Sequence, residues 1–168
     1  MKHVIIYYGS STGATESVAG RIAQKLNIDK GAVRNVTAIN KDDVNDAEVL
    51  LLGTSTWGAG DLQDDWYDGI KLLKSTDLSG KVIALFGCGD SQSFSDTFCG
   101  ALGVLYNELK DSGAKFVGAV SASDYDFSDS ESVVDGNFVG LALDEANEDD
   151  KTDRRIDSWI NEIENYIS

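Results

Sequence analysis

The sequence lacks most of the residues that build metal and disulfide chemistry. Its 168 residues include one histidine and two cysteines, Cys88 and Cys99, and no C-x-x-C motif. This composition gives no basis for a metal site or a thioredoxin-like dithiol. We expect both thiols to be reduced and partly buried. Proline is absent altogether, so no loop of the chain is stiffened by a fixed backbone angle.

Basic residues and long apolar runs are also scarce. Lysine and arginine number 14 against 29 acidic residues, which gives a formal net charge of -15. Such a charge repels nucleic acid and anionic membranes and attracts basic protein partners, although solubility alone is an alternative explanation. The apolar runs are too short to span a bilayer. Met1 to His3 lead into the first predicted strand without a signal-peptide pattern, so we expect a cytoplasmic protein.

A strand, a hydroxyl-rich turn and a helix are predicted at the start of the chain. The apolar run Val4 to Tyr8 ends at Gly9, and apolar residues recur at helical spacing from Val18 to Leu26. We place Thr12 at the N-cap of this helix. The turn would then offer unpaired N–H groups and hydroxyls to an anion; its residues are Ser10, Ser11, Thr12, Gly13, Ala14 and Thr15.

This turn matches neither of two better-known phosphate loops. The Lys-Ser/Thr pair of the P-loop and the G-x-G-x-x-G fingerprint are both missing. No lysine or arginine occurs from His3 to Gly20, so a triphosphate would have no counter-charge. The turn therefore favours one phosphomonoester held by neutral donors, and the alternative is an ordinary capped turn.

Strands alternate with helices along the rest of the chain. We predict strands at 32–36, 49–54, 82–87 and 116–120, helices at 62–73, 98–109 and from Thr152, and a strand-like run at 138–143 after the Asp/Ser-rich stretch 121–136. This alternation predicts a single α/β domain over residues 1–168, with a parallel sheet covered on both faces. The loops 10–15, 55–60 and 88–98 leave the carboxyl ends of strands, so they should converge at the switch point of strand order, where such sheets bind ligands.

Two of these loops carry an aromatic residue. Trp57 and Phe94 could cover the two faces of a flat ring by offset stacking. The alternative for each is a place in the core.

The motifs together resemble the long-chain flavodoxins. The similarity covers Gly9 to Glu16, Thr54 to Trp66, Gly87 to Asp90 with Phe94 and Phe98, and the C-terminal stretches 136–144 and 152–155. It implies a three-layer sandwich with a five-stranded parallel sheet in the order 2-1-3-4-5 and an insertion, 121–136, in the fifth strand. It also implies a low-potential one-electron carrier with non-covalently bound flavin mononucleotide (FMN), and not an enzyme.

The resemblance assigns the cofactor contacts residue by residue. Phosphate would lie on the turn 10–15, and the ring and ribityl chain would meet the two later loops; those contacts are Ser55, Thr56, Trp57, Gly58, Ala59, Gly60, Cys88, Gly89, Asp90, Phe94, Thr97 and Cys99. A buried structural thiol is the alternative for Cys99. Three residues depart from the family pattern: Phe94 stands where tyrosine is usual, Ser55 where proline is, and Ala146 where many members have aspartate.

The resemblance also implies partners. These are redox proteins with basic faces, such as ferredoxin/flavodoxin-NADP reductase or oxoacid oxidoreductases, which a monomer would meet at its acidic rim. Two alternatives are weighed: an FMN-dependent NAD(P)H quinone or nitro reductase, and a receiver-like phosphate-binding module. The second expects acidic residues after the first strand, where Tyr8 and Gly9 stand.

Overall fold

A parallel sheet forms the middle layer of the protein. The computed structural model describes residues 2–10, 13–57 and 60–168. The strands of this sheet are β1 (Val4–Gly9), β2 (Val33–Asn35), β3 (Val49–Trp57), β5 (Val82–Cys88), β6 (Lys115–Val117) and β10 (Leu141–Leu143). They lie in the order β10-β5-β3-β1-β2, with β6 also paired to β5. The expected 2-1-3-4-5 order is confirmed.

The fifth strand of the sheet is split in two. β6 pairs with Val82 to Ala84, and β10 pairs with Phe86 to Cys88. Because β3 occupies the other side of β5 along its whole length, β6 and β10 share one edge. The chain between them forms a small antiparallel sheet from β7 (Val120–Ser121), β9 (Asn137–Phe138) and β8 (Val133–Val134). The predicted insertion in the fifth strand is therefore confirmed.

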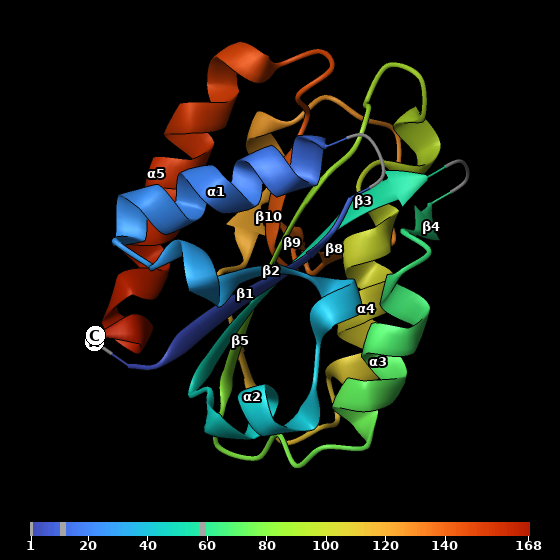
Figure 1. Cartoon of the computed structure of the whole chain (residues 1–168). Helices are drawn as coiled ribbons and strands as arrows, with labels where there is room; N and C mark the ends of the chain where they lie inside the picture. The colour runs from blue at the N-terminus through green and yellow to red at the C-terminus, as the bar shows by residue number, and fades with distance from the viewer. Residues whose placement is uncertain (1, 11–12, 58–59) are drawn as a thin grey trace.

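Helices cover both faces of the sheet (Figure 1). α1 (Ala14–Leu26) and α5 (Asp149–Ile167) pack on one face, and α2 (Lys41–Asp46), α3 (Trp66–Lys74) and α4 (Gly100–Leu109) pack on the other. Successive residues in the first part of β1, β3 and β5 alternate between the two cores, so each of these strands begins with an unbroken apolar run. Short 3₁₀ turns lie at Lys30–Ala32, Val36–Ala38, Ser95–Thr97 and Ala122–Asp124. None of the described helices is long and apolar enough to cross a membrane.

Some predicted element bounds are wrong. Leu62 belongs not to a helix but to β4 (Asp61–Leu62), which folds back antiparallel on Thr56 and Trp57. α4 begins at Gly100, after Phe98, and α5 begins at Asp149 instead of Thr152.

Two predicted strands are interrupted. The run 116–120 is broken at Gly118, whose φ of 86° turns the chain out of the main sheet. The run 138–143 is divided between β9 and β10, which belong to different sheets. In both places the apolar pattern continues although the strand does not.

Candidate functional site

The turn after β1 lies on the N-terminus of α1. Ser10 Oγ accepts a hydrogen bond of 3.0 Å from the Gly13 N–H and closes the turn. Gly13 has a φ of 92° and precedes the first helical residue, so the N-cap is Gly13 and the prediction of Thr12 is wrong. The left-handed backbone at this position favours glycine. The helix geometry leaves the first-turn N–H groups without intrahelical partners, as an anion site requires.

The surroundings of this turn suit a single phosphate better than a polyphosphate. Among the described atoms, nothing lies within 4 Å of the position that a Gly13 Cβ would take, so the turn is open on that side. The nearest cation along α1, Arg21, is bound to Glu145 at 2.9 Å and to Asp153. The hydrogen bond that Arg21 donates to Asp153 is the main cause of the raised pKa of Arg21. Its charge is therefore already compensated by protein carboxylates.

The three predicted loops leave one edge of the sheet. Gly9 is in register with Thr54, and Ser55 is in register with Cys88. A buried hydrogen bond of 2.9 Å joins Thr15 Oγ1 to Ser55 Oγ, and so ties α1 to the end of β3. This contact uses the hydroxyl of Ser55, the residue that departs from the family pattern. The predicted convergence of the loops is confirmed.

The loop 55–60, which the resemblance assigns to the flavin ring and which we call the first ring loop, is flanked by the antiparallel pair β3 and β4. β3 extends to Trp57, and Gly60, with a φ of 92°, leads into β4. Thr56 Oγ1 accepts a 3.2 Å hydrogen bond from the Ala101 N–H, in the first turn of α4. A Cβ on Gly60 would lie 3.4 Å from Thr97 Cβ, so the two ring loops are packed together.

Part of the predicted contact set cannot be placed. Ser11, Thr12, Gly58 and Ala59 lie outside the described residues, as does the side chain of Trp57.

The loop 88–98, which we call the second ring loop, is hydrogen-bonded at its start to the C-terminal part of the chain. The Gly89 N–H donates to the Leu143 carbonyl at 2.9 Å. Asp90 Oδ1 accepts from the N–H groups of Gln92 and Ser93 and from Asn147 Nδ2 at 2.8 Å. The Ser93 N–H is the largest contribution to the lowered pKa of Asp90, so this carboxyl stays ionised at neutral pH. Phe94 is 45% exposed, which argues against its alternative place in the core.

A buried carboxylate beside this loop was not predicted. Asp144 is fully buried, accepts a hydrogen bond from Ser91 Oγ, and accepts another of 2.9 Å from Asn147 Nδ2. Because Asn147 also binds Asp90, the network joins the loop to the segment before α5. No local motif marks this network, since the bonds from Ser91 to Asp144 and from Asn147 to Asp90 each span more than 50 positions.

The two cysteines are free and buried. Burial raises the pKa of Cys88 to about 12 and that of Cys99 well above its ordinary value. The Cys99 thiol is fully buried and points at the Leu143 carbonyl, 3.7 Å away. This arrangement matches the structural alternative for Cys99, so we leave its side chain out of the direct cofactor contacts. In the described part of the chain, no cluster of residues could hold a metal ion.

We expect neither thiol to react readily in the folded protein. At pH 8 the Cys88 thiol, with a pKa of about 12, is almost entirely protonated, so its modification by Ellman's reagent should be about a thousandfold slower than in urea. Cys99 is fully buried, so the reagent should not reach it in the folded protein. The same protein unfolded in urea is the control, and there both cysteines should react. Prompt modification of one thiol in the native state would contradict the buried placement.

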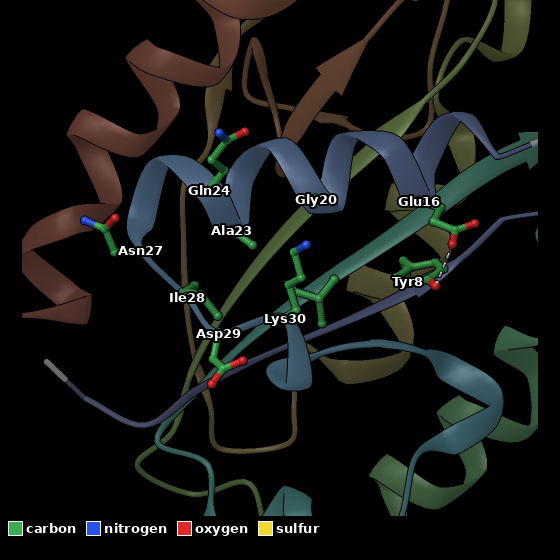
Figure 2. A pocket seen from close by; sticks show the side chains of 10 residues that line it. Tyr8, Glu16, Gly20, Ala23, Gln24, Asn27, Ile28, Asp29 and Lys30 are labelled. Carbon is green, nitrogen blue, oxygen red and sulfur yellow. Dashed lines mark hydrogen bonds between the residues drawn. The ribbon is translucent and has the colours of Figure 1, made fainter.

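A broad groove lies outside this site. It encloses about 860 Å³ between α1 and the segment that leads into β2, and Figure 2 shows Tyr8 and Glu16 at one end, joined by a 3.2 Å hydrogen bond. Its lining residues come from 8–33 and include none from the two ring loops. This groove is therefore separate from the site formed by the three loops, although it is large.

An open parallel α/β sheet with three loops at one carboxyl edge belongs to the doubly wound class of folds, which bind ligands at that edge. Comparison with known proteins narrows this class. The flavodoxin family model matches residues 6–159. Flavodoxin 1 of Azotobacter vinelandii is 43% identical over 164 residues, covering 95% of this chain and 94% of that protein. The flavodoxin of Nostoc sp. is 41% identical over 162 residues, covering 96% of this chain and 95% of that protein.

Solved structures agree with the sequence relatives. The Fusobacterium nucleatum flavodoxin bound to flavin mononucleotide superposes with a TM-score of 0.92 at 34% identity, covering all of both chains. This chain belongs to the flavodoxin family. The family expected from the sequence is confirmed, and with it the expectation of an electron carrier that is not an enzyme. The reductase and receiver-like alternatives are not favoured.

Proposed function

We propose that this protein carries single electrons with FMN bound non-covalently at the three converging loops. The observation that carries the proposal is the open N-terminus of α1, without lysine or arginine in its first turn, beside two ring loops at one sheet edge. The turn 10–15 would hold the phosphate, and the loops 55–60 and 88–99 would hold the ring and ribityl chain. When bound, FMN supplies one-electron redox chemistry.

The charge of the ring loops favours a low reduction potential. Asp61, Asp64 and Asp96 are exposed and form no ion pair with a described lysine or arginine. Asp90 is kept ionised by its three hydrogen-bond donors. Like charges near a site of low dielectric disfavour the addition of negative charge to the cofactor.

The same carboxylates form a docking surface for partners with basic faces. We propose redox proteins such as ferredoxin/flavodoxin-NADP reductase or oxoacid oxidoreductases as these partners. The net charge of -15 supports attraction to a basic surface and repulsion between copies of the chain, in keeping with a monomer. We further propose that the protein works in the cytoplasm, where such partners are found.

Salt dependence tests the docking surface. With FMN-loaded protein and a basic-faced NADPH-dependent reductase, the second-order rate of electron transfer should fall at least about tenfold as ionic strength rises from 10 mM to 0.5 M. A double variant, Asp61→Asn with Asp64→Asn, should lower the rate at low salt and weaken its salt dependence. Asp111→Asn, beyond the C-terminal end of α4, is the control. A rate that does not change with salt would overturn the proposal.

A further inference from the structure

The insertion 121–136 runs along the second ring loop. The N–H groups of Ser128 and Asp129 both donate to the Ser95 carbonyl, at 2.9 and 3.0 Å. Ser95 Oγ also donates to Ser128 Oγ at 3.1 Å. Two segments more than 30 positions apart are therefore joined at main-chain level.

Two buried serines extend this contact to the start of α4. Ser130 is 6% exposed and donates through its hydroxyl to the Phe98 carbonyl. Ser132 is fully buried and donates to the Cys99 carbonyl. The Ser132 hydroxyl also accepts a 2.7 Å hydrogen bond from the Gly103 N–H. It thus supplies a cap that α4 does not obtain from its own N-terminal residue.

Cys99 shows why this support is needed. Its φ of 50° lies in the left-handed region, which a residue with a Cβ adopts at a conformational cost. The hydrogen bond from Ser132 holds the carbonyl of this strained residue. Without that bond, relaxation of Cys99 would move the backbone of the second ring loop.

Aromatic contacts also hold Phe98, at the end of the second ring loop, in place. The centroid of the Phe98 ring lies 5.6 Å from the ring centroid of Phe127, 5.8 Å from that of Phe138 and 6.1 Å from that of Tyr125. At the other end of the loop, Asp90 and Ser91 are held by Asn147 and Asp144. Phe94 lies between these two anchored ends and is itself exposed.

We propose that Ser130 and Ser132 are positioning residues for FMN. Their hydroxyls bind the Phe98 and Cys99 carbonyls and the first turn of α4. These bonds fix the backbone of the second ring loop in the position that lets Phe94 contact the flavin. The inference rests on the proposed FMN site and gives the insertion a role inside that site.

The test compares FMN affinity with the stability of the apoprotein. Titration of FMN by loss of its fluorescence should give a dissociation constant about tenfold higher for Ser132→Ala, which loses the buried hydrogen bonds to the Cys99 carbonyl and from the Gly103 N–H. For Ser130→Ala, which loses those to the Phe98 carbonyl and from the Ser132 N–H, it should be about threefold higher. The visible circular dichroism of the bound flavin should also change in both variants. Urea unfolding of each apoprotein measures the general cost of the substitution.

Two controls separate positioning from general destabilisation. Ser123→Ala lies in the same insertion, where the one hydrogen bond of the Ser123 hydroxyl to a described residue is that with Ser121 Oγ. Val44→Ala creates a cavity beneath α2, whose one buried residue is Val44, at the opposite end of the sheet from the ring loops (Figure 1). Both should bind FMN within about twofold of the natural protein.

Three results would overturn the inference: an unchanged affinity and spectrum in folded Ser130→Ala and Ser132→Ala, the same loss in Ser123→Ala, or an equal loss in Val44→Ala. If Ser132→Ala does not fold, the FMN affinities of Ser130→Ala and of Ser128→Ala are used to test the inference. The Ser128 side chain is exposed. Failure of the natural protein to bind FMN would instead reject the proposed function.

Discussion

Replacing Ser10 with aspartate is expected to raise the dissociation constant for FMN about a thousandfold. Ser10 Oγ accepts the Gly13 N–H that closes the turn, and a carboxylate at this position can accept the same hydrogen bond. The turn should therefore keep its shape while gaining a negative charge. Two like charges about 4 Å apart at an effective dielectric constant near 20 repel by about 4 kcal/mol, which corresponds to this loss of affinity.

Asparagine at the same position separates charge from shape. Ser10→Asn offers a neutral acceptor of the same size as the aspartate, and we expect it to bind FMN within about tenfold of the natural protein. Riboflavin, which has no phosphate, should bind the natural protein and Ser10→Asp alike. If Ser10→Asp binds FMN as tightly as Ser10→Asn does, the phosphate does not bind at this turn and the assignment is wrong.

Replacing Trp66 with alanine should lower the free energy of unfolding of the apoprotein by about 3–5 kcal/mol. The indole is fully buried and its Nε1 donates to the Gly53 carbonyl at 2.7 Å. It also fills the space beside Gly9, where a Cβ would lie only 2.6 Å from Trp66 Cδ1. The substitution leaves a cavity beside the end of β1 and removes the hydrogen bond to the Gly53 carbonyl in the middle of β3.

Urea unfolding followed by far-UV circular dichroism measures this loss, with Tyr67→Ala as the matched control. Tyr67 is the next residue of α3 but is 52% exposed, so its truncation should change stability by less than about 0.5 kcal/mol. A loss below about 1 kcal/mol for Trp66→Ala would mean that the core beneath the loops repacks around the cavity.

The topology could be predicted because the central strands are buried on both faces. β1, β3 and β5 are continuous apolar runs bounded by glycine or small polar residues, and right-handed crossovers then leave few arrangements of the sheet. The strand, turn and helix at the start of the chain could be predicted as well, since they are adjacent in sequence. Only the helix cap was misplaced, because Gly13 takes a left-handed backbone that a hydroxyl residue does not favour.

The other features depend on contacts that are distant in sequence. β4 exists because Asp61 and Leu62 pair with the end of β3, and two residues are too few to show a period. Ser132 is one serine in a stretch rich in serine and aspartate. Its partners are the main chain of Cys99 and Gly103, and no side-chain pattern reveals such a contact.

The short outer strands of the sheet have a consequence for behaviour in solution. At one edge β2 has three residues, and at the other β6 and β10 have three each, in two separate pieces. An unpaired strand edge is a template on which a second molecule can add, and edges of this length give little for such growth. The long strands β3 and β5 lie inside the sheet. A protein that must leave each partner in order to reach the next is thereby protected against aggregation through its own sheet.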